Sequence, residues 1–475
     1  MQHTHHTIMD KFNEEVQEPV SPHGQYFNSS VICSYVFAFL ELAIPFDNSL
    51  AIPLLKDVFI PINPRFSSIM VKDKEGKMRW RKVEVKPEEH LKIPIFPETI
   101  NSSSCELYDN YFNDYVTSIL AERTPQDKPL WEIHIINYPT TNVACTIIFK
   151  LHHALGDGYS LMGALLSCLQ RADDPSLPLS FPSQRPQLDS KYAKINLFKK
   201  LCFDISSFFS SISDFGSSII KTRMIEDDKT PIRSGYEGNE SQPVTLSTIS
   251  LSLDQIKEIK SKLKVTINDV VCGMVFYGIR LYMKEMNEKT KIANSTAVVM
   301  LNTRNIGGYR SLMEMQKPES KGLWGNQISF LQIPIPKVSQ SVISNPLEFV
   351  WNSRELIKRK RHSFSVYLIA LLMDLEMRLR GPEAVAKIIY NTIRNSSVFM
   401  SNLVGPIEKM ALANHPVNGL YFTVAGGPEN LTITIISYEK ILRIAMKTQK
   451  GFIDEYKLKF CIEKAAAIIS KAAME

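Results

Sequence analysis

The 475-residue sequence predicts an α/β protein of two halves, each a mixed β-sheet with helices, joined by a long crossover. Three observations support this prediction. Strand-like and helix-like patterns alternate up to about residue 172 and begin again near residue 246. Residues 172–190 are rich in proline and serine, the clearest linker signal in the chain, and residues 225–246 form a second loop. We therefore expect an N-terminal half at 1–185, a crossover linker at 186–245 and a C-terminal half at 246–475.

Short sequence patterns predict the elements of the N-terminal half. The alternating run Met78–Val85 predicts a strand, and the spacing of apolar residues at Tyr108–Glu122 predicts a helix. The apolar stretches Pro129–Tyr138 and Val143–Leu151 are separated by Thr-Thr-Asn, which indicates two strands joined as a hairpin. A helix is then predicted at Tyr159–Gln170, directly after a glycine-containing turn.

The C-terminal half begins with an alternating strand at Val244–Leu253. A short helix capped by Asp254 follows, and then a long buried helix whose N-cap is Thr266 or Asn268. The remaining predicted elements are strands at 295–304 and 325–335, a helical stretch at 346–386, strands at 397–406, 419–428 and 431–448, and a helix from 455.

Composition and charge exclude several classes of protein. The net charge of +6 is only mildly basic, and no block of like charges forms a nucleic-acid-binding stripe, so no nucleic-acid partner is expected. Seven scattered cysteines without a CxxC pair argue against a disulfide framework or a zinc site and for reduced, buried thiols. The N-terminus lacks the apolar region of a signal peptide, and no continuously apolar run is long enough for a spanning helix.

The most informative stretch is KLHHALGDGYS, at Lys150–Ser160, which follows the apolar run VACTIIF. Consecutive strand residues point to opposite faces, so His152 and His153 cannot both face one cavity. Gly156 and Gly158 permit either a positive φ or close approach of the backbone. Because a helix follows at once, we expect the histidines where a buried strand ends at a cleft, a common place for catalytic groups in α/β proteins.

A neutral histidine at this position can accept a proton from a hydroxyl group, because its ordinary pKa of about 6.5 lies near neutral pH. Asp157 is expected either to pair with an arginine, and so position the loop, or to orient the imidazole ring. Metal binding is the rival interpretation, but it needs further ligands, and the sequence has no HExxH motif or suitably spaced Cys/His set. From the residue types alone, catalysis, a structural role and metal binding all remain open.

The stretch HHALGDG matches the HHxxxDG signature of the CoA-dependent acyltransferase superfamily, which includes the condensation domains of peptide synthetases. Other segments resemble, in the right order, motifs of the wax ester synthase/diacylglycerol acyltransferase family. They are EPVSPHGQYF (18–27), DKPLWEIHII (127–136), TINDVVCG (266–273), WGNQISFLQIPIP (324–336), MSNLVGP (400–406) and LTITIISYEKILRIAM (431–446). The DFGWG motif of plant BAHD acyltransferases is absent, which argues against that neighbouring family.

The resemblance implies a two-domain CoA-dependent acyltransferase fold with an active-site tunnel between the halves. It implies transfer of a long-chain fatty acyl group from acyl-CoA to a long-chain alcohol, which is wax ester synthesis, and less effectively to diacylglycerol. Acyl-CoA would be a co-substrate, and no bound cofactor or metal is expected.

By position in the HHxxxDG motif, the resemblance makes His153 the general base, which takes the proton from the acceptor hydroxyl as its oxygen attacks the thioester. His152, Asp157 and Gly158 would shape the motif, and Gly158 would allow the backbone or the substrate to approach closely. The transfer would be direct, within a ternary complex, with no acyl-enzyme.

Five further residues are expected to contact substrate. The developing oxyanion needs a hydrogen-bond donor, and Asn268 is the candidate, with helix capping as its alternative. Asp269 belongs to the same motif. Trp131 lines an acyl tunnel or is a packing residue, and Ser401 and Asn402 contact substrate or form a turn.

Two charged residues have expected partners. Arg304 follows a predicted strand and would pair with Asp157 or with the phosphates of CoA. Glu132, within the predicted hairpin, would pair with a loop arginine.

Residues 197–220 carry an apolar stripe with alternating spacings of three and four, which indicates one face of a helix. This helix either packs on its own protein or docks on a membrane surface. Asp204 and Asp214 interrupt the stripe, so a spanning helix is not expected. Because the implied substrates are insoluble in water, we expect attachment to a membrane surface through residues 194–224. Resemblance to the family's plant members suggests the endoplasmic reticulum, with the plasma membrane as a second location.

Two alternatives to wax ester synthesis remain. The first is a lipid-binding or acyl-binding protein that kept the fold and lost catalysis, against which the intact HHALGDG and NDVV motifs argue. The second is an acyltransferase that acts on another alcohol or on an amine, as condensation domains do. The absence of an adjoining carrier domain within the 475 residues weakens that alternative.

Overall fold

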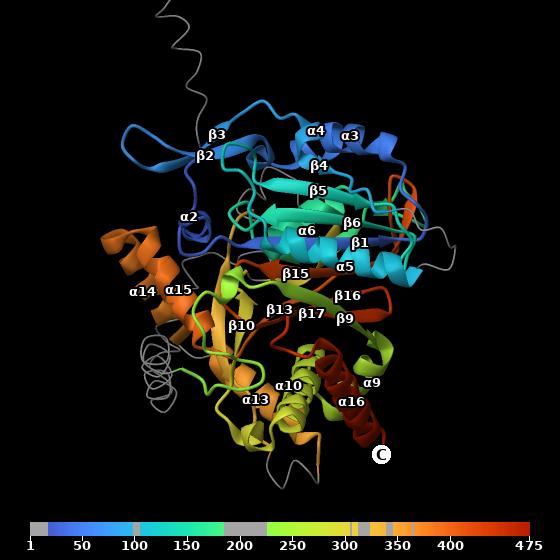
Figure 1. The fold of residues 1–475 in the computed structure, drawn as a ribbon, viewed down its shortest axis with the longest axis vertical. Coiled ribbons are helices and arrows are strands. Elements are labelled where there is room, and N and C mark those ends of the chain that lie inside the picture. The colour runs from blue at the N-terminus through green and yellow to red at the C-terminus, as the bar shows by residue number, and fades with distance from the viewer. Residues whose placement is uncertain are drawn as a thin grey trace, which may run out of the picture.

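A computed structural model describes residues 18–97, 105–184, 226–304, 306–311, 324–338, 345–362 and 365–475 of the chain. These residues form two sheet-rich halves, one above the other in Figure 1, and the predicted α/β fold with two mixed sheets is confirmed. The apolar stripe predicted at 197–220 lies outside the described residues.

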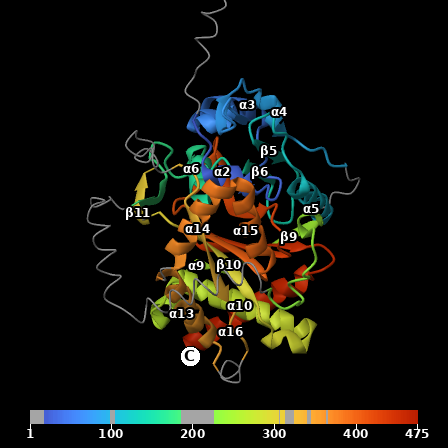
Figure 2. The same ribbon diagram turned by 90° about the vertical axis from the view of Figure 1, so that its left-hand side faces the viewer.

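The first sheet contains the predicted hairpin. Its strands run in the order β4 (Leu91–Lys92), β5 (Trp131–Ile136), β6 (Cys145–His152), β1 (Tyr35–Leu42), β15 (His415–Ala425), β14 (Met410–Leu412) and β7 (Gln170–Arg171). Only β4 and β5 pair in parallel. Every residue of β1 and β6 is buried, as expected for strands covered on both faces. The helices α5 (Cys105–Ala121) and α6 (Gly158–Ser167) lie on opposite sides of these strands (Figure 2).

The second sheet is formed by the C-terminal half alone. Its strands run in the order β12 (Ile328–Pro334), β10 (Thr296–Asn302), β13 (Val398–Leu403), β16 (Leu431–Tyr438), β17 (Ile441–Gln449) and β9 (Val244–Ser252). One face packs on α10 (Ile267–Met286), α16 (Glu455–Met474) and α9 (Leu253–Leu263), which lie at the bottom of Figure 1. The other face turns toward the first half.

Side chains alternate along β13, so this one strand contributes to the hydrophobic cores on both faces of the second sheet. Val398 and Met400 pack into the helix-covered core, whereas Phe399, between them, packs into the core shared with the first half. Successive strand residues point to opposite faces, so the second sheet presents a complete row of side chains to the first half. The site described below lies in this layer.

The two halves exchange strands. β14 and β15 belong to the first sheet although they come from the expected C-terminal half, and β8 (Ser180–Gln184) pairs with β11 (Ile306–Ser311). The predicted boundaries at residues 185 and 245 stay a prediction.

The helical stretch predicted at 346–386 is three helices: α13 (Glu348–His362), α14 (Ser365–Arg380) and α15 (Pro382–Arg394). Gly381, with φ +79°, and Pro382 at the first position of α15 separate the last two. Helix α15 packs beside α2 (Pro22–Phe27), as Figure 1 shows. In the described part of the chain, no helix is both long and apolar enough to cross a membrane.

Helix capping corrects one prediction and decides another. Ser252, and not Asp254, caps α9, because its hydroxyl accepts the N–H of Gln255. Thr266 caps α10, with its hydroxyl accepting the N–H of Asp269 and the Asp269 carboxylate accepting the N–H of Thr266.

The remaining elements are short. They are α3 (Ala51–Leu54), α4 (Pro87–His90), the hairpin of β2 (Ser68–Lys72) and β3 (Met78–Lys82), and the single turns at Asn48–Leu50, Leu55–Phe59, Ile60–Ile62, Pro64–Ser67, Asn239–Ser241 and Glu288–Ile292. The six cysteines in the described ranges are free, and five are buried; Cys105 is exposed and Cys202 lies outside these ranges.

Candidate active site

The two histidines lie at the end of β6, where the strand leaves the sheet. His152 is the last residue of β6 and pairs with Tyr35 of β1, and the backbone N–H of His153 still donates to the carbonyl of Ser34, at 2.8 Å. His153 begins the turn that follows the strand. The two rings have different neighbours, Cys33 and Tyr35 for His152 and Phe27 and Asn326 for His153, so they do not share one cavity, as predicted.

His152 faces an enclosed part of the core. Its Nδ1 accepts the backbone N–H of Ala154 at 3.0 Å, and its Nε2 lies 3.5 Å from the sulfur of Cys33. The ring also meets Tyr35 edge-on. An Nδ1 that accepts a hydrogen bond leaves the proton on Nε2. Burial lowers the pKa of His152 to about 3, so this side chain is neutral and braces the turn.

His153 faces the opposite way and contacts both halves of the chain. Its ring stacks on Phe27 of α2, with centroids 4.3 Å apart. Its Nδ1 lies 3.0 Å from Oδ1 of Asn326, whose Nδ2 donates to the carbonyl of His153 at 3.0 Å. Since the amide nitrogen is already the donor, Oδ1 accepts a hydrogen bond from Nδ1–H, and Nε2 carries the lone pair.

The environment of His153 keeps it available as a base. Burial lowers the pKa of His153, and the Asp157 charge and the Asn326 hydrogen bond oppose this only in part. Within the described ranges, its Nε2 has no hydrogen-bond partner. A neutral imidazole with a lone pair on Nε2 can take a proton from a hydroxyl group.

Asp157 positions the loop after the histidines. It is the N-cap of α6, where one carboxylate oxygen accepts the N–H of Ser160 at 3.0 Å. The other oxygen accepts from Arg304 Nη1 at 2.5 Å and from the N–H of Gln327 at 2.8 Å. The predicted pairing of Arg304 with Asp157 is therefore confirmed. Both oxygens are used, so Asp157 fixes the turn and does not bond the ring of His153.

A loop from the C-terminal half, Trp324–Gln327, is hydrogen-bonded to the HHALGDG turn. The hydroxyl of Ser160 and the guanidinium of Arg304 both donate to the carbonyl of Gly325, at 2.9 and 2.7 Å. The indole N–H of Trp324 donates to the carbonyl of Leu155 at 2.8 Å. The Ser160 and Trp324 bonds join the two halves at the turn that follows His153.

Gly158, the first residue of α6, is needed because β13 packs closely against it, and not because its backbone has a positive φ. Its φ is ordinary, but a Cβ there would lie 3.1 and 3.2 Å from the methyl groups of Leu403 on β13. A larger residue would therefore push the two halves apart near the site.

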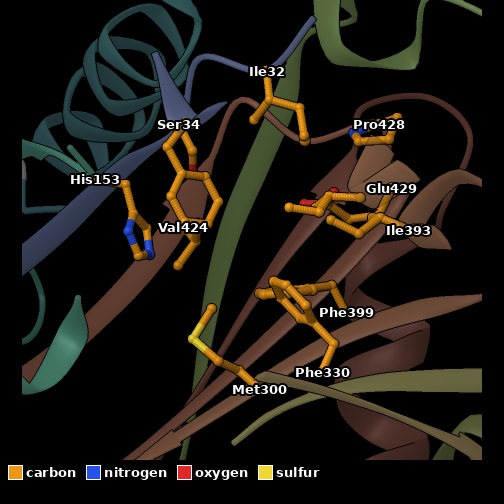
Figure 3. Close-up of a pocket in the computed structure, with 13 residues that line it drawn as sticks. Ile32, Ser34, His153, Met300, Phe330, Ile393, Phe399, Val424, Pro428 and Glu429 are labelled. Carbon is orange, nitrogen blue, oxygen red and sulfur yellow. The ribbon is translucent and has the colours of Figure 1, made fainter. Parts of the chain in front are cut away.

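A narrow pocket opens beside His153, between the two halves (Figure 3). Its free volume of about 30 Å³ is far too small for a fatty acyl chain, so a substrate must widen it. Three polar residues line it, His153, Ser34 and Glu429. Its other side chains are apolar and come from α2, β10, β12, β13, β15 and α15: Phe27, Met300, Phe330, Ile389, Ile393, Phe399 and Val424, with Ile32 and Pro428 at its edge.

The predicted substrate residues lie elsewhere. Trp131 is fully buried, donates its indole N–H to the carbonyl of Phe66 at 2.8 Å and stacks on His90, which is the packing alternative. Asn268 accepts a hydrogen bond from Asn402 at 2.9 Å.

Neither Asn268 nor Asn402 lines the His153 pocket, and Asp269 completes the cap of α10. Ser401 is buried on β13 and lies 3.9 Å from the sulfur of Met300, a pocket residue. Roles of these four residues in substrate binding stay predictions.

The prediction that Glu132 pairs with a loop arginine is wrong. Its carboxylate pairs with Lys150 of the neighbouring strand at 2.8 Å, and not with a loop arginine. Lys150 and Glu132 are cross-strand neighbours in the hairpin, so the pairing follows from register.

Sequence reasoning missed four residues around His153: Phe27, His23, Asn326 and Glu429. The first two belong to SPHGQYF and the third to WGNQISF, two segments quoted as motifs without a role for their side chains. Burial, followed by the electrostatic effect of His153, lowers the pKa of His23 to about 4, so this third histidine is also neutral near pH 7. No cluster of three potential metal ligands occurs among the described residues.

Two family models match the chain. The wax ester synthase/diacylglycerol acyltransferase catalytic domain matches residues 109–271, and the C-terminal domain of the same family matches residues 324–470. Wax ester synthase/diacylglycerol acyltransferase 11 from Arabidopsis thaliana is 29% identical over 97% of this chain and 96% of its own length. Wax ester synthase/diacylglycerol acyltransferase 4 from the same plant is 27% identical over 91% and 86%.

Solved structures share the fold at low identity. The wax ester synthase/diacylglycerol acyltransferase from Marinobacter aquaeolei VT8 is similar with a TM-score of 0.61 and 16% identity, over 96% of this chain and 100% of that one. The first condensation domain of the CDA synthetase is similar with a TM-score of 0.54 and 12% identity, over 98% and 97%. At such identities these structures support the fold alone.

Proposed function

The chain belongs to the wax ester synthase/diacylglycerol acyltransferase family, and from this premise we propose that it transfers a long-chain fatty acyl group from acyl-CoA to a long-chain alcohol. Diacylglycerol is the second, less effective acceptor. One observation carries the proposal: His153 holds a neutral Nε2 lone pair at an apolar pocket between the two halves.

The proposed chemistry is a direct transfer within a ternary complex. Nε2 of His153 takes the proton of the acceptor hydroxyl as the hydroxyl oxygen forms a bond to the thioester carbon. When the carbon–sulfur bond breaks, the proton passes from His153 to the sulfur of CoA. The products are the ester and CoA thiol, and the side chain returns to its neutral state.

The oxyanion formed on the thioester oxygen needs a donor. Asn268 was the predicted donor, and it would have to act from outside the pocket that His153 lines. Ser34 is a second candidate, because it lines this pocket and its carbonyl accepts the backbone N–H of His153. Replacing Ser34 by alanine is expected to lower kcat if its hydroxyl is the donor, whereas Asn268→Ala would do so if the first candidate is right.

The structural roles of the other motif residues support this mechanism. His152 fixes the strand end through Ala154, and Asp157 anchors the turn through Arg304. Gly158 lets β13 approach. These contacts fix the chain on either side of His153, and none requires contact with the substrate.

We propose that the enzyme acts as a peripheral protein at the membrane of the endoplasmic reticulum, with the plasma membrane as a second location. The predicted attachment segment, 194–224, lies outside the described residues. A described surface also suits lipid: Leu371, Leu375 and Leu379 are one turn apart on α14 and 66%, 50% and 73% exposed. Four consecutive cations, Lys358–Arg361, end α13 just before this helix and would attract anionic lipid.

The direct test is acyl transfer from radiolabelled palmitoyl-CoA, with hexadecanol and diacylglycerol supplied separately. Wild type should form ester with hexadecanol and less with diacylglycerol, and His153→Ala should lower the rate by about 10²–10⁴-fold, the usual effect of losing a general base. Equal activity of His153→Ala would contradict the mechanism. Absence of ester with either acceptor would contradict the proposed substrates and favour the alternative of an inactive lipid-binding protein.

A further inference from the structure

Glu429 is a buried carboxylate in the His153 pocket that the proposed mechanism does not use. It lies in the loop between β15 and β16, is 8% exposed, and is the one acidic residue in the pocket lining. Figure 3 shows its side chain extending into the pocket from the side opposite His153. Burying a charge in apolar surroundings is unfavourable unless the charge has partners.

One oxygen of Glu429 has those partners. Its Oε1 accepts from Nζ of Lys447 at 2.8 Å and from the hydroxyl of Thr432 at 2.6 Å. Thr432 and Lys447 face each other across β16 and β17, so the sheet register fixes both donors. Lys447 is itself buried. This arrangement holds the carboxylate in one orientation at the pocket wall.

The second oxygen is left for a ligand. In the described part of the chain, Oε2 has no hydrogen-bond partner. It lies directly over Gly427, which also lines the pocket, and a Cβ at position 427 would collide with it. The loop is therefore shaped to leave room for this oxygen at the pocket.

A second buried carboxylate provides a comparison. Glu41 on β1 pairs with Arg443 of β17 at 2.8 Å, and this pair joins the first sheet to the second. Glu41 does not line the pocket. If Glu429 served only to join strands, it would have no need to lie at the pocket, where apolar residues fill the space at lower cost.

We propose that Glu429 positions a substrate at His153 by accepting a hydrogen bond from an O–H or N–H group on that substrate. This inference rests on the proposed function, which supplies two possible sources of the donor. One is a second hydroxyl on the acceptor, as in a 1,2-diol or a monoacylglycerol. The other is an amide N–H in the pantetheine arm of acyl-CoA. A carboxylate accepts hydrogen bonds and cannot donate them. An alcohol substrate whose only other polar groups are ester carbonyls therefore forms no hydrogen bond with Glu429.

The test compares kcat/KM for 1,2-hexadecanediol, 1-monopalmitoylglycerol and 1-hexadecanol, each with palmitoyl-CoA. The variants are Glu429→Gln and the double variant Glu429→Leu/Lys447→Met, which leaves no unpaired buried charge. Glu41→Gln is the matched control, because it alters a buried ion pair outside the pocket. Thermal unfolding of each variant shows that it is folded.

If the acceptor is the source, the preference for dihydroxy acceptors over hexadecanol falls by about 10- to 100-fold in the double variant, as expected for a lost charge-assisted hydrogen bond. If acyl-CoA is the source, KM for palmitoyl-CoA rises by a similar factor with all three acceptors. Glu41→Gln changes neither quantity. The inference is overturned if a folded double variant changes neither quantity, or if Glu41→Gln changes them equally.

A binding measurement separates failure of this inference from failure of the proposed function. The shift in Tm is measured for wild type and the double variant with 1,2-hexadecanediol, with hexadecanol and with palmitoyl-CoA. Suppose wild type forms no ester, yet one ligand raises Tm in wild type and not in the double variant. The proposed reaction is then wrong, and Glu429 still recognises that ligand. If no ligand gives a shift that depends on Glu429, the inference is wrong as well.

Discussion

The two sides of the strand end at His152 and His153 have nearly equal burial and different hydrogen bonding. His152 is 0% exposed and His153 is 1% exposed. On the His152 side, Nδ1 is bonded to Ala154 and Nε2 lies against the Cys33 sulfur, so the ring has no lone pair to offer. On the His153 side, Asn326 occupies Nδ1 and the lone pair of Nε2 is directed to a pocket. Burial therefore does not distinguish the proposed base from the structural histidine. The two rings differ in their hydrogen bonds, which leave a free lone pair only on His153.

The largest effect we expect is from breaking the contact that holds the His153 side together. Arg304→Leu should lower the free energy of unfolding by about 3–5 kcal/mol, because it leaves Asp157 buried without its cation. Urea unfolding measures this loss. Activity should fall too, because the turn that positions His153 loses its anchor.

The matched control for Arg304 is Arg378→Ala on α14. Arg378 also pairs with an aspartate, Asp374, at 2.9 Å, but both side chains are more than half exposed. An exposed pair of this kind contributes about 0–1 kcal/mol. Equal losses of stability in the two variants would mean that Asp157 and Arg304 do not form the buried anchor described above.

The next effect tests the His152 side. His152→Leu removes the acceptor of the Ala154 N–H and should cost about 1–3 kcal/mol of stability, the penalty for an unpaired buried donor. The folded variant should keep most of its kcat, because His152 offers no base. A variant with unchanged stability and abolished turnover would instead make His152 part of the chemistry.

The smallest effect tests the partner of His153. Asn326→Leu removes the acceptor that keeps the proton on Nδ1, so the ring is free to place the proton on Nε2. One neutral hydrogen bond contributes about 1 kcal/mol, so kcat should fall by roughly fivefold. Steady-state kinetics with palmitoyl-CoA and hexadecanol measure this change. Asn137→Leu is the control, because Asn137 is hydrogen-bonded to the backbone of Phe46 and lies outside the pocket. An increase in kcat, or an equal fall in the control, would contradict the role of Asn326.

Much of the fold could be predicted from sequence because the elements that matter are long and regular. The alternation in Val244–Leu253 and the apolar runs around HHALGDG identified strands that the structure confirms as β9 and β6. The break at Gly381 and Pro382 was missed although Gly-Pro is a turn signal, because the apolar residues up to Leu379 and from Ala384 were assigned to one helix. The return of β14 and β15 to the first sheet was also missed, since no local pattern states which sheet a strand joins.

The candidate site was predicted where residues are close in sequence and missed where they are distant. The different surroundings of His152 and His153 agree with the alternation of side chains along a strand, and the pairing of Asp157 with Arg304 is one of the two predicted alternatives. Asn326 and Glu429 lie 173 and 276 residues from His153 in the chain, and only folding brings them to it. Trp131 is buried as the packing alternative expects, and its lining of a tunnel stays a prediction, because a buried aromatic has the same local pattern in a core as in a tunnel.

The most direct test of the central claim, that His153 is a neutral base, is the pH dependence of kcat/KM for acyl transfer to hexadecanol between pH 4.5 and 8.5, a range that brackets the ordinary histidine pKa of about 6.5. Burial lowers the pKa of His153 below its ordinary value, so the base stays unprotonated at neutral pH. We therefore predict a rate that is constant above pH 6.5 and falls on the acid side with an apparent pKa below about 6.5. A rate that falls as the pH rises through 6 to 8 would require a protonated histidine and would contradict the claim.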